Sequence, residues 1–321
     1  MNRFRRIWAA LIALCWMLAA LSGCTQTAQP TQAQPLLRVY ATFYPLYACA
    51  EMITQGAPEL TLSCLVQPQD GCLRDYQLSD WDYALLQRSA DLVIAGGRGL
   101  ESFENTLYAM GDAGPAVACV LYNMEFAENR QTAHIDPDRE SHFLDSNPHI
   151  YMCIEGMLSI AESICAQMVT VDPENADLYQ NNLESAQGKL NALSAEIHAI
   201  AGQIEGRDAV VMNEALTYAA NEYQLNVVYS VDRDSGEAFH DAELQACIEA
   251  LTPYRDAVLL IEKQAPETFV EALEDAGFTV ARMDVLSTRS AREGADGYFE
   301  AQRSNAQAFA AAYQNEMENA A

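Results

Sequence analysis

Apolar side chains recur along residues 173–204 at alternating spacings of four and three positions. This spacing places them on one stripe of a helix: Tyr179, Leu183, Ala186, Leu190, Leu193, Ile197, Ile200 and Ile204. Asp172 is a favourable N-cap, and Pro173 suits the first helical position. The pattern predicts one helix from Pro173 to Ile204, about 48 Å long at ~1.5 Å per residue. A helix of this kind must pack its stripe against the rest of the chain.

Short apolar runs of strand length alternate with helical segments on both sides of this predicted helix. Before it, we expect strands at 37–42, 60–66, 92–95 and 116–121, and helices at 79–89 and 101–110. After it, we expect strands at 209–212, 226–231, 257–261 and 279–283, and helices at 214–223, 242–251, 266–276 and 298–315. The alternation is typical of parallel sheets covered by helices. The predicted fold class is α/β, with two lobes, each a mostly parallel sheet wrapped by helices, joined by one long spine helix.

The N-terminus has the order of a secretory signal. Three arginines within the first six residues precede an apolar run that ends at Leu21. That run is shorter than the roughly 20 residues needed to span a bilayer as a helix. Leu-Ser-Gly then precedes Cys24, which resembles the bacterial lipoprotein signal, whose cysteine carries the lipid. Residues 25–35 are rich in Gln, Thr, Ala and Pro and read as a flexible tether.

These patterns predict five consecutive parts of the chain. They are a signal peptide at 1–23, a tether at 24–35, an N-terminal α/β lobe at 36–155, linking helices at 156–205 and a C-terminal α/β lobe at 206–321. A cleft for a ligand is expected beyond the carboxyl ends of the strands. The lipid on Cys24 would hold the protein at the outer face of the bacterial cytoplasmic membrane.

Charge and motifs exclude several classes of function. The chain has 18 basic and 45 acidic residues and a formal charge of −27, which disfavours nucleic acid as a partner and attracts cations. Nucleophile-elbow, phosphate-loop and H-E-x-x-H motifs are missing from the sequence. Gly96-Gly97-Arg98-Gly99 lacks the spacing of a dinucleotide fingerprint. The sequence therefore predicts a binding protein and not an enzyme.

Several motifs, in this order, carry a resemblance to a known family. They are Ala41-Thr42-Phe43-Tyr44-Pro45-Leu46-Tyr47, Arg74-Asp75-Tyr76-Gln77-Leu78-Ser79, Asn147-Pro148-His149-Ile150-Tyr151 and Asp172-Pro173-Glu174-Asn175-Ala176. From Val39 to Asn315 the chain resembles the substrate-binding lipoproteins of zinc and manganese ABC importers. The resemblance implies a divalent metal ion as the transported ligand. It also implies a membrane permease and its ATPase as partners.

The resemblance also implies four metal ligands, and this chain departs from two of them. Arg74 and Asn213 stand where the family has metal-binding side chains, whereas His149 and Asp284 match. A guanidinium has no lone pair to offer a metal, and a neutral amide offers one weak oxygen. Glu214 adjoins Asn213 and is the alternative ligand.

Three interpretations of this site stay open. In the first, His149, Glu214 and Asp284 form a rebuilt site of nitrogen and oxygen donors, which suits manganese or iron better than structural zinc. In the second, Arg74 pairs with Asp284 and the cleft binds an anionic or chelated solute. In the third, that pair is only structural, and the protein is a surface scaffold or adhesin without a tight ligand. His134 and His142, in an acidic segment, are expected to lie in a solvated loop.

Overall fold

The protein is described here from a computed structural model. The structure describes residues 36–68, 73, 76–111, 114–126, 147–202, 204–231, 233, 239 and 241–314, and the backbone alone at 132–133 and 315–319. The chain divides into two compact units, Met1–Pro35 and Leu36–Ala321, and the second is described below. The predicted signal peptide, the tether and Cys24 lie outside the described residues.

The first sheet has four parallel strands in the order β2-β1-β3-β4. The strands are β1 (Leu37–Ala41), β2 (Leu60–Cys64), β3 (Leu92–Ala95) and β4 (Ala116–Cys119). The helices that accompany them are α2 (Tyr44–Thr54), α3 (Asp80–Ser89) and α4 (Glu104–Ala109). All four residues of β3 are buried, as expected of a central strand covered on both faces.

The second sheet is also parallel, in the order β5-β7-β6-β8-β9. Its strands are β5 (Thr132–Ala133), β6 (Asp208–Val211), β7 (Asn226–Val231), β8 (Val258–Glu262) and β9 (Val280–Met283). The helices around it are α7 (Leu216–Glu222), α8 (Asp241–Leu251), α9 (Glu267–Asp275) and α10 (Gly294–Asn319). Residues of β8 alternate between two hydrophobic clusters, one shared with α8 and α9 and the other with α7 and α10. Helices therefore cover both faces, and the predicted α/β class is confirmed.

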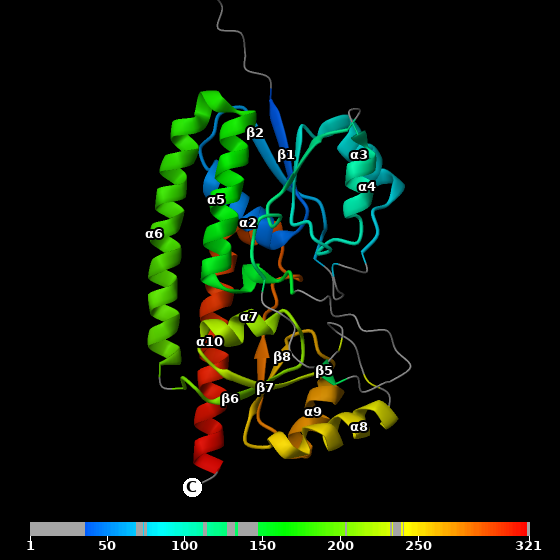
Figure 1. The fold of residues 1–321 in the computed structure, drawn as a ribbon, viewed down its shortest axis with the longest axis vertical. Coiled ribbons are helices and arrows are strands. Elements are labelled where there is room, and N and C mark those ends of the chain that lie inside the picture. The colour runs from blue at the N-terminus through cyan, green and yellow to red at the C-terminus, as the bar shows by residue number, and fades with distance from the viewer. Residues whose placement is uncertain are drawn as a thin grey trace, which may run out of the picture. The chain divides into compact units, whose positions relative to one another are not determined.

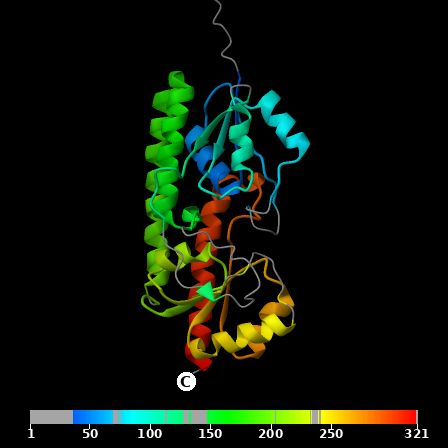
Figure 2. The same cartoon turned by 45° about the vertical axis from the view of Figure 1, so that its right-hand side comes forward.

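Two long helices, α5 (Ile154–Val171) and α6 (Ala176–Ala201), link the sheets and pack against each other (Figures 1 and 2). The predicted single helix from Pro173 to Ile204 is too long at both ends. A 3-10 turn at Pro173–Asn175 comes first, and α6 is about 39 Å long at ~1.5 Å per residue. The Asp172 carboxylate accepts a hydrogen bond from the Tyr179 hydroxyl (2.5 Å) and does not cap the helix backbone.

The predicted stripe of α6 does face the core. Tyr179, Ala186, Leu190, Leu193 and Ile197 are buried, and α6 contacts α2, α5 and α10. The C-terminal helix α10 contacts β9 of the second sheet and α2, which packs on the first sheet. One continuous cluster of buried residues therefore extends from the first sheet, through the linking helices, to one face of the second.

Candidate metal site

His149 lies in a buried loop between the first sheet and α5, and its neighbour Asn147 selects the tautomer of the neutral ring. Nδ2 of Asn147 donates to the Glu214 carbonyl (2.7 Å), so Oδ1 of Asn147 must be the atom that faces His149. That oxygen accepts the His149 backbone N–H (3.1 Å) and lies 2.9 Å from Nδ1 of the ring. Because Oδ1 can only accept, Nδ1 must carry the proton. In the neutral ring the lone pair is then on Nε2, the atom that would bind a metal.

Glu214 follows strand β6 and approaches this histidine. Its carboxylate is buried, and Oε1 lies 3.6 Å from Nδ1 of His149. The side chain of Asn213 serves the local turn, because its Oδ1 accepts the backbone N–H of Ala215 (3.0 Å). Of these two adjacent residues, Glu214 is therefore the one whose side chain approaches the His149 ring. Its oxygen lies on the Nδ1 side of the ring, so a metal shared with Nε2 requires the Glu214 side chain to turn.

Asp284 follows strand β9 and is held from both its backbone and its side chain. The fully buried Asn305 amide accepts the Asp284 N–H (2.7 Å) and donates to its carbonyl (2.8 Å). The Leu286 N–H donates to Oδ1 (2.8 Å), and Nε of Arg289 donates to Oδ2 (2.8 Å). Burial lowers the pKa of Arg289, but the hydrogen bond and charge of Asp284 outweigh burial and raise that pKa overall. The guanidinium is therefore firmly cationic beside Asp284.

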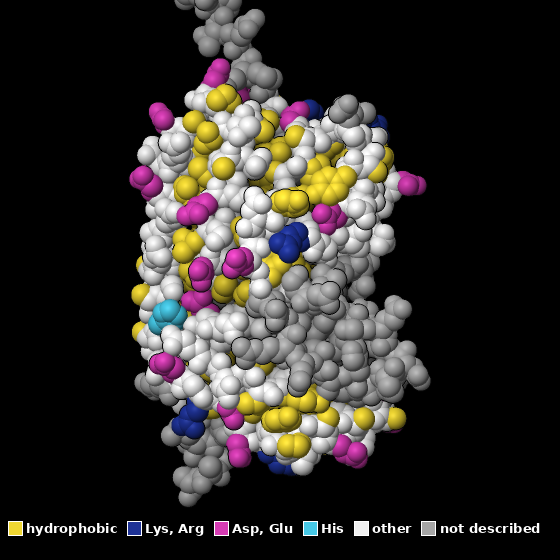
Figure 3. All heavy atoms as spheres, viewed as in Figure 1, with side chains coloured by type: hydrophobic (Ala, Val, Ile, Leu, Met, Phe, Trp, Pro, Cys, Tyr) yellow, Lys and Arg dark blue, Asp and Glu magenta, His cyan; other side chains and the backbone are white. Residues whose placement is uncertain are grey.

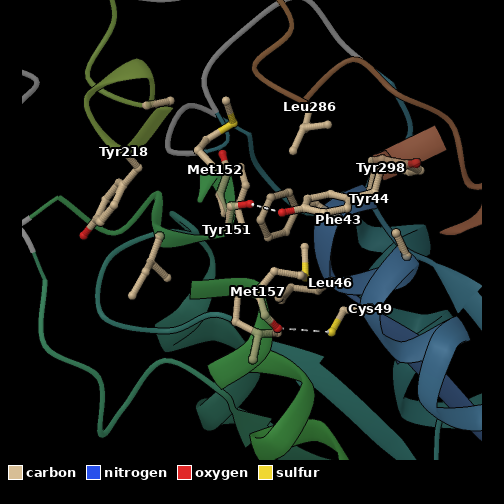
Figure 4. Packing of buried hydrophobic residues seen from close by; sticks show 14 of the residues in the cluster. Phe43, Tyr44, Leu46, Cys49, Tyr151, Met152, Met157, Tyr218, Leu286 and Tyr298 are labelled. Carbon is tan, nitrogen blue, oxygen red and sulfur yellow. Dashed lines mark hydrogen bonds between the residues drawn. The ribbon is translucent and has the colours of Figure 1, made fainter. Parts of the chain in front are cut away.

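Residues Phe43 and Tyr44, at the start of α2, connect the loops that carry His149 and Asp284. Phe43 packs edge-on against Tyr151 (5.3 Å between ring centroids), and Tyr151 packs edge-on against His149 (5.8 Å). The Tyr44 hydroxyl donates to the Gly294 carbonyl (2.8 Å), in the segment after Asp284. Tyr298 donates to the Tyr151 carbonyl (3.2 Å), so the C-terminal helix joins the same cluster (Figure 4). Aromatic packing thus brings the two loops into one region.

The structure brings only part of the predicted ligand set together. His149 and Glu214 are neighbours, whereas Asp284 is paired with Arg289. Within the described residues, no three His, Cys, Asp or Glu side chains lie close enough to hold a metal ion in this conformation. Arg74, and with it the possible Arg74–Asp284 pair, lies outside the described residues, as do His134 and His142. The ligand set therefore stays a prediction.

Two important residues of this region were missed by sequence reasoning. Arg289 lies five positions after Asp284, and a basic residue so close to a predicted ligand was the available signal. Glu101 follows the glycine-rich turn after β3 and is 2% exposed. It accepts hydrogen bonds from the Thr42 hydroxyl and from the N–H groups of Gly96 and Gly97. An acid that follows closely spaced glycines at a strand end was the corresponding signal.

A groove of about 1110 Å³ lies beside this region, along α5, α6 and α7, and its lining includes Ile150 and Tyr218. It is lined in part by Glu155, Glu162, Glu222 and His198, and it contains none of the predicted ligands. His198 is about half exposed, as its place off the apolar stripe predicts, and lies 3.4 Å from Glu222. We place the candidate metal site at His149 and Glu214 because buried donors after strand ends, and not groove size, define a site of this kind.

Two parallel sheets linked by long helices, with buried polar side chains after the strand ends, define a two-lobed α/β binding protein. The sequence model of one family, described as zinc-uptake complex component A, periplasmic, matches residues 39–312. The chain belongs to this family.

Curated relatives agree with this assignment. The chain is 26% identical to the high-affinity zinc uptake system protein ZnuA of Bacillus subtilis (strain 168) over 231 residues, which cover 69% of this chain and 70% of the relative. It is 27% identical to the iron-binding protein YfeA of Yersinia pestis over 228 residues, which cover 68% of each chain. The predicted class, a solute-binding component of a metal uptake system, is confirmed.

Solved structures show the same fold. A crystal structure of ZnuA matches with a TM-score of 0.68 at 22% identity, covering 86% of this chain and 98% of the other. The binding protein FpvC of Pseudomonas aeruginosa, in complex with Mn²⁺, matches with a TM-score of 0.71 at 20% identity, covering 87% and 98%. The two-lobed architecture therefore extends over most of each chain.

Proposed function

We propose that this protein is the extracytoplasmic receptor of a metal-ion ABC importer and captures its metal with His149, Glu214 and Asp284. The observation that carries the proposal is the buried pair of His149 and Glu214, in which Asn147 selects the tautomer whose neutral ring has its lone pair on Nε2. A buried imidazole beside a buried carboxylate is a combination of donors that divalent transition metals accept.

The donor types indicate which metals to test. A set of one imidazole nitrogen and two carboxylates suits manganese or iron better than it suits structural zinc. A structural zinc ion is usually held by thiolates or by several histidines. Relatives named for zinc and for iron both occur in this family. Manganese, iron and zinc are therefore the candidate ligands.

Charge and anchoring support the same function. Acidic side chains are spread over the face seen in Figure 3, and the whole chain has a formal charge of −27, which favours the approach of cations. Lipid on Cys24 would anchor the protein to the outer face of the cytoplasmic membrane. There it would deliver the metal to a permease driven by a cytoplasmic ATPase, as its family membership suggests.

The proposal predicts that metal stabilises the protein through His149. A site filled at 100 times its dissociation constant raises the free energy of unfolding by about 2.7 kcal/mol, which thermal unfolding of metal-stripped protein detects readily. His149→Ala should weaken binding by about 100-fold, a loss of about 2.7 kcal/mol, and so reduce the stabilisation at the same metal concentration to about 0.4 kcal/mol. His198→Ala is the matched control, because His198 is also a histidine but is paired with Glu222 and is not one of the proposed ligands.

Manganese, iron, zinc and calcium are added in turn. A metal shift of undiminished size in His149→Ala would rule out this site, while a shift with calcium alone would contradict the choice of a nitrogen-containing site. If no metal shifts the wild-type protein, the proposed function is wrong, and anionic and chelated solutes should be tested next.

A further inference from the structure

The Asp284 carboxylate is already engaged on both oxygens. One oxygen accepts the Leu286 backbone N–H within its own turn, and the other accepts Nε–H of Arg289, each at 2.8 Å. The Asp284 side chain is 8% exposed and that of Arg289 is 12% exposed, so the pair is largely screened from water. A metal ion that uses Asp284 therefore meets a carboxylate that already has a cationic partner.

Arg289 also has a second acidic partner nearer the solvent. Its Nη1 donates to Oε2 of Glu293 (2.6 Å), four residues further on, and the Glu293 side chain is 40% exposed. The guanidinium thus bridges a buried acid and an exposed one. It can release Asp284 and keep its bond to Glu293, so that its charge stays paired when it moves.

The backbone leaves room for this arginine. A Cβ built on Gly297 would lie 2.5 Å from the Tyr44 hydroxyl, 2.8 Å from Cβ of Glu293 and 3.3 Å from Nη1 of Arg289. The missing side chain at position 297 therefore lets the guanidinium and the Tyr44 ring lie close to the first turn of α10. A larger residue there would displace the Tyr44 hydroxyl or Glu293 and would crowd the guanidinium.

We propose that Arg289 is a built-in competitor of the transported metal, because it occupies the Asp284 carboxylate until an incoming cation takes its place. This inference rests on the proposed function. A guanidinium cannot coordinate the ion and repels it, so its presence beside a ligand weakens metal binding. Its departure from Asp284 is part of capture, and its return favours release to the next carrier.

The competition has two consequences with opposite signs. In the metal-free protein Arg289 neutralises a buried carboxylate, so its loss destabilises the fold. In the metal-bound protein the ion replaces that positive charge, so loss of Arg289 favours binding. A merely structural ion pair would give the first effect without the second.

The experiment compares metal binding and thermal unfolding of the full chain, in detergent, for the wild type, Arg289→Gln and Arg292→Gln. Arg292 is exposed and lies three residues away, so its variant removes the same charge without touching Asp284. Arg289→Gln should bind manganese about tenfold more tightly than the wild type, while its metal-free form unfolds at a lower temperature. Arg292→Gln should match the wild type in both measurements.

Each outcome decides whether Arg289 is a competitor of the metal or only part of a structural ion pair. Unchanged or weaker manganese binding by Arg289→Gln, with normal binding by the wild type, would overturn the competitor role and leave the proposed function intact. Binding by the variant alone would support it strongly. If neither protein binds manganese, iron or zinc, the proposed function fails and this inference with it. Should Arg289→Gln fail to fold, Glu293→Gln is the second variant: without its exposed partner the guanidinium should stay on Asp284, so manganese should bind more weakly than in the wild type, and unchanged or tighter binding would overturn the competitor role.

Discussion

Replacing Gly156 with alanine should cost the protein more than about 3 kcal/mol of unfolding free energy, because the new methyl group has no space. Gly156 is the third residue of α5, and a Cβ built there would lie 2.0 Å from the Ile150 carbonyl oxygen and 2.5 Å from its Cγ1. That carbonyl accepts the N–H of Cys153 (3.2 Å), so it belongs to the turn that leads into the helix. The backbone must therefore move, and denaturant unfolding measures the resulting loss of unfolding free energy.

The same substitution should weaken metal binding, because Ile150 directly follows His149. Gly188→Ala is the matched control: Gly188 is an exposed position within α6, and a Cβ there meets no atom within 4 Å. Alanine at that position should stabilise the helix by roughly 0.5–1 kcal/mol and leave metal affinity unchanged. Equal unfolding energies for the two variants would show that the turn at Ile150 yields easily and does not fix the histidine.

The sequence predicts those parts of the fold that have a regular apolar pattern. The stripe of α6 and the buried β8 strand were both located, because period and strand length are local properties. Helix α2 was not predicted as a helix. Nine of its eleven residues are buried, so it has no polar face to give a helical period, and only the structure shows that it lies between α5, α6 and α10.

The site was predictable to the level of residue types after strand ends. Parallel strands bring their carboxyl ends to one edge, so Glu214 and Asp284 were expected near the ligand. Which partner each residue takes depends on side-chain directions and on contacts between distant segments. The assignment of Asn213 to a turn and the pairing of Asp284 with Arg289 are of this kind, and neither follows from spacing.

Replacing Glu101 with alanine should lower the unfolding free energy by about 3 kcal/mol or more. Its carboxylate accepts the Thr42 hydroxyl (2.7 Å) and the N–H groups of Gly96 (2.7 Å) and Gly97 (2.9 Å), which follow β1 and β3. Each buried donor left without a partner costs about 1–3 kcal/mol. Gly97 has a φ of +77°, so the turn depends on glycine and on this acid to hold its shape.

The unfolding free energy lost in Glu101→Ala should also depend on pH, in a direction set by the burial of the carboxyl group. Burial raises the pKa of Glu101 in the folded protein, and its hydrogen bonds offset this only in part. A raised folded pKa contributes stability that is fully present below the unfolded value, near 4.3, and is lost as the pH rises through the folded value. The difference in unfolding free energy between the wild type and Glu101→Ala should therefore be larger at pH 4 than at pH 7, as urea unfolding can measure. Glu104→Ala, which removes an acceptor from the exposed Gly99 N–H and from the exposed Tyr108 hydroxyl, should cost less than about 1 kcal/mol. A Glu101→Ala loss as small as that, or one that grows as the pH rises, would show that the turn is held by other contacts.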